Sequence, residues 1–233
     1  MKKLLLLLFL VSPVHALDLE DIRTEVRLRV KDSGVSTRFT DAQIDSFSNE
    51  GQRDVVNATW VIKKSTSITL VSGTTFYSLP TDLIAIGRVT WRNRNIYEAT
   101  LTKLDSDFNN SAWLDTGGPP QKYYQDPTQS DKIGIYPFPN SASSTGTIKI
   151  NYFSQGTNMS ADSDVPFNGE NRYISYHDLI IFYDCYRVHL LEGEIDKATL
   201  YRQEYEARVL LMRDRVGSLP GYIPGLSGTR SNP

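Results

Sequence analysis

The chain has 233 residues, of which 39% are hydrophobic and 22% are charged, a composition typical of a globular protein rather than a disordered one. Its 25 basic and 27 acidic residues give a formal net charge of −2, which argues against a strongly electrostatic nucleic-acid binder. The single cysteine, Cys185, excludes an intramolecular disulfide framework and every zinc motif built from several cysteines.

Residues 1–16 have the pattern of a secretory signal. Lys2 and Lys3 precede an apolar run over residues 4–11, and Val14-His15-Ala16 offers small residues at a cleavage site. The apolar run is too short to span a bilayer. Two interpretations stay open for this leader: a signal peptide that is cleaved, or a retained apolar arm that inserts into a partner.

Two amphipathic helices are predicted after the leader. Over residues 17–31, apolar residues recur at three- and four-residue spacing. A second helix begins at Thr40, which forms a capping box with Gln43, and extends to about residue 61. Gly51 lies on the apolar stripe of this second helix, which predicts that a neighbouring element approaches it closely.

From residue 63 to residue 170 the chain is predicted to form an inserted antiparallel β domain. The hydrophobic period changes to two, and Gly, Pro, Asn and Asp clusters separate six or seven short strands. One short helix is expected over residues 100–113. Because no long helix separates the strands, a βαβ sheet is not expected.

The last structured block is predicted to be a helical hairpin. Ser175 caps its first helix with Asp178 at the third position, and Gly193 ends that helix. The second helix covers about residues 195–216, with Ile195 among its inward-facing residues.

The predicted fold class is therefore α+β. Residues 17–62 and 171–216 form a helical bundle, residues 63–170 form the inserted antiparallel β domain, and residues 217–233 form an extended C-terminal arm.

The C-terminal arm is too rich in glycine and proline for a helix or a central strand. It nevertheless carries several apolar residues, for which a simple linker has no use: Leu219, Tyr222, Ile223, Pro224 and Leu226. The alternatives are a disordered tail and an arm that docks on a neighbouring subunit through these residues.

No catalytic, metal-binding or cofactor-binding constellation is recognisable. His177 and His189 are twelve residues apart on one predicted helix, too far apart in height to share a metal ion, and we expect both at a surface or an interface. Cys185 lies in an apolar stretch and is expected to be a buried, inert thiol.

Two acidic clusters are interpreted in the same way, without a metal. Glu192, Glu194 and Asp196 straddle a predicted helix–helix turn, where a solvated turn is the simplest interpretation. Asp162-Ser163-Asp164 begins like a calcium loop but lacks its glycine at position six and its glutamate at position twelve.

An ordered series of segments over about residues 19–216 resembles the head-to-tail adaptor proteins of tailed bacteriophages. The segments comprise residues 40–45 and 49–55, 75–83 and 86–89, 118–124 (Gly-Pro-Pro-Gln-Lys-Tyr-Tyr), 133–139 (Ile-Gly-Ile-Tyr-Pro-Phe-Pro), 148–153, 162–167 and 198–206. The leader is a departure, because members of this family generally begin near residue 17.

This resemblance implies a structural virion protein without enzymatic activity or cofactor. Such adaptors form a ring, here expected to be a dodecamer, that joins the portal to the tail and lines or surrounds the DNA exit channel. The implied partners are other copies of the chain, the portal protein, tail or nozzle proteins, and DNA only in transit, with no membrane. The implied location is the virion neck, after assembly in the host cytoplasm.

The resemblance also suggests which residues meet these partners. The apolar residues of the C-terminal arm are expected to contact the portal or a neighbouring subunit. Tyr201, Arg202, Glu204 and Tyr205 are candidates for the contact between subunits of the ring. A mildly acidic chain that lines a channel is not expected to hold the DNA that passes through it.

Two alternatives remain. One is an exported bacterial envelope or binding protein, periplasmic once the signal peptide is cleaved. The other is an enzyme whose site has no recognisable sequence pattern.

Overall fold

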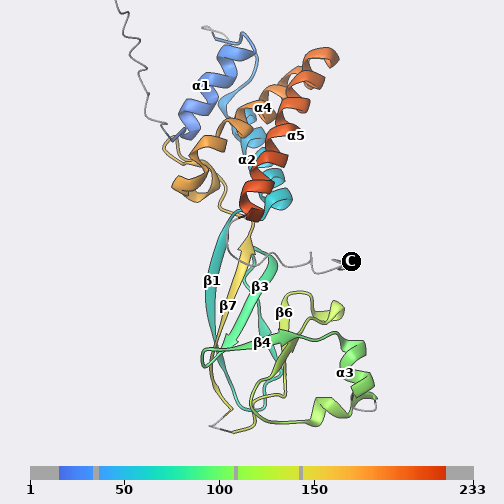
Figure 1. The fold of residues 1–233 in the computed structure, drawn as a ribbon. Coiled ribbons are helices and arrows are strands. Elements are labelled where there is room, and N and C mark those ends of the chain that lie inside the picture. Colours follow the sequence, from blue (N-terminus) through green and yellow to red (C-terminus); the bar gives the residue numbers. More distant parts are fainter. Residues whose placement is uncertain (1–15, 34–36, 108–109, 142–143, 219–233) are drawn as a thin grey trace, which may run out of the picture. The chain divides into compact units, whose positions relative to one another are not determined.

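The computed structural model describes residues 16–33, 37–107, 110–141 and 144–218 (Figure 1). Within these residues the chain is mixed α+β, with five α-helices and a seven-stranded sheet. It divides into two compact units, one of residues 1–54 and 157–210 and the other of residues 55–156 and 211–233. Residues 157–170, which we expected in the β domain, therefore belong to the unit that holds the helices.

Capping boxes define the starts of the first two helices. Helix α1 spans Leu19–Arg29 and begins at Asp18, whose side chain accepts a hydrogen bond from the backbone of Asp21. Helix α2 spans Asp41–Thr59. Its predicted box is confirmed, because Thr40 N donates to Gln43 Oε1 at 2.9 Å and Gln43 N donates to Thr40 Oγ1 at 3.3 Å.

Helix α4, Asp178–Leu191, is the most deeply buried helix of this unit. Leu179, Ile180, Ile181, Cys185 and Val188 are all at most 1% exposed, as expected for a helix with apolar residues around its whole circumference. Gly193 ends the helix in a positive-φ conformation, as predicted.

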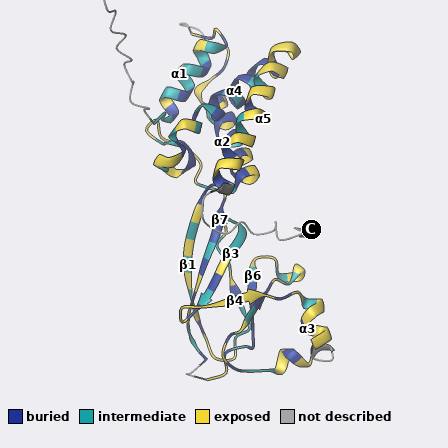
Figure 2. Cartoon of the chain, in the orientation of Figure 1, coloured by how far each residue is buried: buried dark blue, intermediate teal, exposed yellow. Residues whose placement is uncertain are grey.

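The start of the helical hairpin differs from the prediction. Ser175 does not cap α4, because Asn171–Tyr176 forms a 3-10 helix and His177 precedes α4 without a side-chain capping bond. Helix α5 spans Ile195–Ser218 and is exposed along most of its length (Figure 2). The inward placement of Ile195 was wrong: this side chain is 58% exposed at the start of α5.

The second unit holds a sheet with the strand order β1-β7-β3-β4-β5-β6-β2. Its strands are β1 Lys63–Leu70, β2 Phe76–Ser78, β3 Leu83–Trp91, β4 Arg94–Glu98, β5 Lys122–Tyr124, β6 Lys132–Tyr136 and β7 Gly146–Ser154. Side chains from both ends of this order form one core, because Tyr77 and Ile133 pack with Val89, Ile148 and Ile150. The sheet therefore curls so that one side faces this core.

One pair of strands corrects the expected antiparallel arrangement: β4 and β5 are parallel. Parallel neighbours need a crossover connection, and here it consists of helix α3, Leu101–Asp107, followed by the 3-10 helix Asn110–Asp115. We expected a single helix over residues 100–113. Trp113 at the end of the crossover packs edge-on against Tyr124 and Tyr136, which fixes the connection to the sheet.

Gly51 provides the close approach that its position predicted. A Cβ at this position of α2 would lie 2.9 Å from ring carbons of Tyr183 and 3.1 Å from its Cβ. The contact involves the inner end of the tyrosine side chain, which cannot swing aside, so α2 and Tyr183 of α4 pack without room for a methyl group.

We expect Gly51→Ala to lower the free energy of unfolding by about 1–3 kcal/mol, because overpacking outweighs the gain in helix propensity. Ser46→Ala, at an exposed position of the same helix, is the matched control and should change stability by less than about 0.5 kcal/mol. Chemical denaturation followed by circular dichroism measures both. A Gly51→Ala protein as stable as the wild type would contradict the close packing.

Candidate functional site

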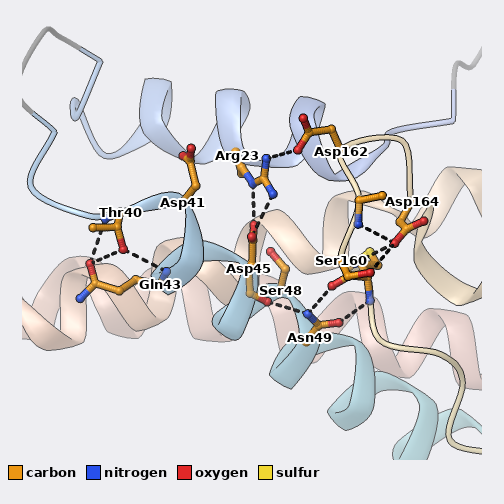
Figure 3. Close-up of polar contacts among 12 residues, drawn as sticks. Arg23, Thr40, Asp41, Gln43, Asp45, Ser48, Asn49, Ser160, Asp162 and Asp164 are labelled. Atoms are coloured by element: carbon orange, nitrogen blue, oxygen red, sulfur yellow. Dashed lines mark hydrogen bonds and ion pairs between the residues drawn. The ribbon is translucent and has the colours of Figure 1, made fainter.

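A salt-bridge cluster joins α1 to α2 and to the segment that follows the sheet (Figure 3). The guanidinium of Arg23 donates to both carboxylate oxygens of Asp45, at 2.5 and 2.9 Å, and to Asp162 at 2.5 Å. Its hydrogen bonds to Asp45, the largest cause, raise the pKa of Arg23 above its ordinary value. One arginine thus holds three segments together, and bidentate geometry of this kind fixes their orientation.

The same segment is held by two amide side chains of α2. Asn49 donates to the carbonyl of Met159 at 2.9 Å and accepts from its N–H at 2.7 Å. Gln52, fully buried, donates to the carbonyl of Thr157 at 2.8 Å and accepts from the N–H of Phe167 at 2.8 Å. Each amide therefore satisfies one backbone N–H and one backbone carbonyl of the segment that follows the last strand of the sheet.

Asp162 and Asp164 have structural partners within the same unit. Asp162 accepts from Arg23, and Asp164 accepts from the backbone N–H groups of Ser160 and Ala161 at 2.7 and 2.8 Å (Figure 3). These bonds stabilise a turn.

Both histidines of α4 and its flank are buried, contrary to the surface positions that we expected. His177 is fully buried beside the ring of Phe167, and burial lowers its pKa to about 4. His189 is buried against Tyr201, with ring centroids 5.4 Å apart. The apolar residues around α4 enclose both rings.

Two other groups on α4 are buried as well. Burial raises the pKa of Cys185 to about 12, which confirms the prediction of a buried thiol with little thiolate character. Burial also raises the pKa of Asp184 well above its ordinary value, and its carboxyl accepts a hydrogen bond from Ser48 of α2 at 2.5 Å.

One group of potential metal ligands occurs in the described part of the chain, at the α4–α5 turn. The ligand atoms of His189, Glu192 and Glu194 lie within 4.8 Å of one another. A cation is already present, because Lys197 Nζ lies 2.8 and 2.9 Å from the two carboxylate oxygens of Glu194. His189 Nδ1 contacts the same carboxylate at 2.7 Å. The group links α4 to α5.

The four candidates for contact between subunits differ in exposure. Tyr205 is only 5% exposed, and its hydroxyl donates to Asp54 of α2 at 2.5 Å. Tyr201 is half-buried against His189 and Phe182. Arg202 and Glu204 are exposed, and Arg202 pairs with Glu206 one turn along at 2.8 Å. Only the two charged candidates offer most of their side chain to a partner.

A surface hollow of about 480 Å³ lies beside these residues. Its lining comes from α2, α4 and α5: Asp54, Tyr183, Tyr186, Arg202, Tyr205, Glu206, Val209 and Leu210. Leu200, which precedes the lining residues on α5, is 64% exposed. This part of α5 therefore combines apolar, aromatic and charged groups, a mixture typical of protein–protein contacts.

The leader residues 1–15 and the arm residues Leu219, Tyr222, Ile223, Pro224 and Leu226 lie outside the described residues. Within the described part of the chain, no helix combines the length and the apolar character that a membrane crossing requires.

Comparison with protein families matches residues 17–222 to a family described as SU10 adaptor protein. The matched region begins directly after the leader and includes the first residues of the C-terminal arm. Comparison with curated proteins gives no match.

Sequence reasoning missed Arg23, Asn49 and Gln52. Asn49 and Gln52 lie in a segment that resembles the adaptors, but no local pattern distinguishes an amide that binds a distant backbone from an ordinary exposed one. Arg23 pairs with a residue 139 positions away, a distance that no spacing rule covers.

Burial of His177 predicts how stability depends on pH. The unfolded chain binds a proton below about pH 6.5, whereas the folded chain does so only near pH 4, so this contribution to stability is complete above pH 6.5 and is lost as the pH falls. We expect a loss of about 2 kcal/mol between pH 7.5 and pH 5 from this group. Denaturation curves of the wild type and of His177→Gln across this range provide the measurement. The substituted protein should show a shallower pH dependence, and equal slopes would contradict a buried neutral imidazole.

Proposed function

Because the chain belongs to the SU10 adaptor protein family of phage head-to-tail adaptors, we propose that it forms a ring in the virion neck that joins the portal to the tail. The ring is expected to be a dodecamer that surrounds the DNA exit channel. Its partners are other copies of the chain, the portal protein, and tail or nozzle proteins. The family match over residues 17–222 carries this proposal.

The helices supply the contacts within the ring, as a bundle that packs side by side with its copies. A closed ring needs two different faces on each subunit, which meet head to tail. Helix α5 fits one of these faces, because Arg202, Glu204 and Leu200 project from it without being buried in their own chain. The hollow beside Arg202 offers a place for a side chain of the neighbouring subunit.

A structural role also agrees with the chemistry of the described residues. The buried titratable groups His177, Asp184 and Cys185 have their pKa values shifted by burial and face the interior of the helical unit. Glu194 at the α4–α5 turn is already paired with Lys197. We therefore propose no enzymatic activity.

The leader is the one feature that favours an exported protein instead. Lys2 and Lys3 with the apolar run over residues 4–11 fit a signal peptide, and they lie outside the matched residues 17–222. Periplasmic protein that begins at Leu17 would support export, and virions that contain Met1 would support a retained arm. N-terminal sequencing of both fractions separates the two.

The ring is tested by reversing the charges on α5. Wild-type protein should form closed rings, seen by negative-stain electron microscopy and as a large species in sedimentation velocity. The double variant Arg202→Glu/Glu204→Arg should shift the protein to monomers, because charges that met complementary groups across the interface now meet like charges.

Arg172→Glu is the control, since it reverses an exposed charge of the same unit on the 3-10 helix Asn171–Tyr176, outside α5. It should leave the rings intact. Rings that persist in the double variant would remove α5 from the interface, and a monomeric wild-type protein at high concentration, alone and with the portal, would overturn the ring itself.

The C-terminal arm is tested by deletion. Removal of residues 217–233 should abolish binding to the purified portal protein while the thermal midpoint of the remaining chain changes little. A second variant replaces Leu219, Tyr222 and Leu226 with Ser in the full-length arm, which removes the apolar contacts but keeps the length and charge of the chain, and it should lose portal binding as the deletion does. Portal binding by the deleted chain at the affinity of the wild type would refute docking through the arm.

A further inference from the structure

The near-neutral charge of the whole chain conceals two units of opposite sign. Residues 1–54 and 157–210 hold thirteen basic and nineteen acidic residues, a formal charge of −6. Residues 55–156 and 211–233, which include the sheet, hold twelve basic and eight acidic residues, a formal charge of +4. The charge of the second unit is also unevenly placed on its surface.

One side of the strands β1, β7, β3 and β4 faces solvent, while the other faces the core with β2, β5 and β6 (Figure 1). We call the solvent side the outer face. It carries polar and basic side chains at alternate positions: Lys63, Ser65, Ser67 and Thr69 on β1, Thr147, Lys149 and Asn151 on β7, Arg88 and Thr90 on β3, and Asn95 and Tyr97 on β4. None of these positions holds Asp or Glu.

A β-bulge at Gly87 places Arg88 on the outer face. Ile86 pairs with Tyr152, whose side chain is on the core side, so a regular strand would turn residue 88 to the core as well. The register shifts between residues 86 and 88, and Arg88 pairs with Asn151 instead. A Cβ on Gly87 would lie 3.2 Å from the carbonyl oxygen of Asn151, which leaves little room for a larger residue here.

The strand register places three basic residues in a row. Lys63 pairs with Phe153 and Arg88 with Asn151, while Lys149 lies two residues further along β7. Positions 153, 151 and 149 are successive outer positions of β7, so the three cations lie at levels about 7 Å apart along the strand direction. Lys149 lies on β7 itself, while Lys63 lies on β1 and Arg88 on β3, the strands on either side of β7. The row therefore crosses three adjacent strands.

These three cations have no carboxylate partner among the described residues. Arg88 donates to the neutral amide of Asn95 at 2.7 Å, and Lys63 lies 5.9 Å from the ring centre of Phe153. Lys64, on the opposite side of β1, shows the contrast, because it pairs with Asp82 at 2.8 Å. A row of exposed, uncompensated positive charges attracts a polyanion.

The outer face is also hollowed beside the row. A depression of about 470 Å³ is lined by Lys63, Ser65, Gly87, Arg88, Asn151 and Phe153, and also by Lys64 and Tyr152, whose side chains belong to the other side of the strands. Its polar lining contains hydroxyl and amide donors as well as cations, and these are the groups that proteins use for phosphate oxygens.

We propose that the outer face binds the phosphate backbone of double-stranded DNA. Lys63, Arg88 and Lys149 contact phosphate groups, and the serine, threonine and asparagine side chains beside them donate hydrogen bonds. The contact is independent of sequence, because a broad face of four strands does not enter a groove to read base edges. The choice of DNA as the polyanion rests on the proposed function, in which this chain surrounds a DNA channel.

The test measures binding of the full-length chain to a fluorescent duplex of random sequence by anisotropy, from about 50 to about 200 mM NaCl. Lys63→Gln/Arg88→Gln/Lys149→Gln should weaken binding at least about tenfold at the lower salt concentration and reduce the slope of log K against log salt by about 0.9 for each lost contact. All three side chains are exposed, so the variant should keep the circular dichroism spectrum and thermal midpoint of the wild type. Lys149→Gln alone should give a smaller change in the same direction.

Lys103→Gln/Arg172→Gln/Lys197→Gln is the matched control, because it removes three exposed charges that already have carboxylate partners. It should bind the duplex as the wild type does. A control that weakens binding as much as the test variant would overturn the proposal, since net charge alone would then explain the effect.

Ring formation, measured on the same samples, separates this inference from the proposed function. Wild-type protein that forms rings but does not bind the duplex at low salt overturns the DNA-binding face and leaves the ring standing. Protein that binds the duplex through these residues but never forms rings keeps the face and refutes the ring. A test variant that binds DNA normally but loses its rings would assign the outer face to a neighbouring subunit and so reject DNA.

Discussion

The structure depends on a long excursion of the chain that has to return to the helix from which it started. The chain leaves α2, forms the whole sheet, and comes back to bind Asn49 and Gln52 across sequence separations of 105 to 115 residues. Closing so long a loop costs conformational entropy, and contacts at two places offset this cost. In one unit, two amide side chains and Arg23 hold the returning segment. In the other, the first and last strands of the excursion, β1 and β7, pair over eight residues.

That pairing also determines the surface of the sheet. Once Lys63 lies opposite Phe153, the alternation of side chains fixes every other residue of β1 and β7 to one face, and a slip by one position would turn lysines inward and isoleucines outward. The burial of Ile148 and Ile150 therefore secures the exposure of Lys149 between them. The bulge at Gly87 then adds Arg88 to the same face. The basic row is thus a consequence of core packing and register together.

Features that depend on neighbours in sequence could be predicted, and features that depend on distant partners could not. The capping box of Thr40 and Gln43, the close packing at Gly51 and the extra conformational freedom at Gly193 each follow from a few adjacent residues. The parallel pair β4–β5, the bulge at Gly87 and the burial of His177 arise only when segments far apart meet. His177 was expected at the surface because nothing near it in the chain indicates the apolar residues that enclose it.

The candidate site divides in the same way: Arg202 and Glu204 are exposed as a solvated helix predicts, whereas the contact of Tyr205 with Asp54 joins residues 151 positions apart.

The net charge of the whole chain hides how differently the charges are distributed over its two units and over the faces of the sheet. A total of −2 argued against any hold on DNA, yet the same residues, counted by unit and then by face, give a strongly acidic group of helices and a row of unpaired cations on a sheet. In the proposed ring around the DNA channel, a small number of phosphate contacts would suit the passage of DNA. Because affinity changes steeply with the number of phosphates neutralised, the three cations of the proposed DNA-binding face would allow contacts that form and break at physiological salt, whereas a uniformly basic surface would hold the duplex in place. In this proposal, the excess of acidic residues in the chain weakens its overall attraction to DNA, and the row of cations places the remaining attraction on the outer face.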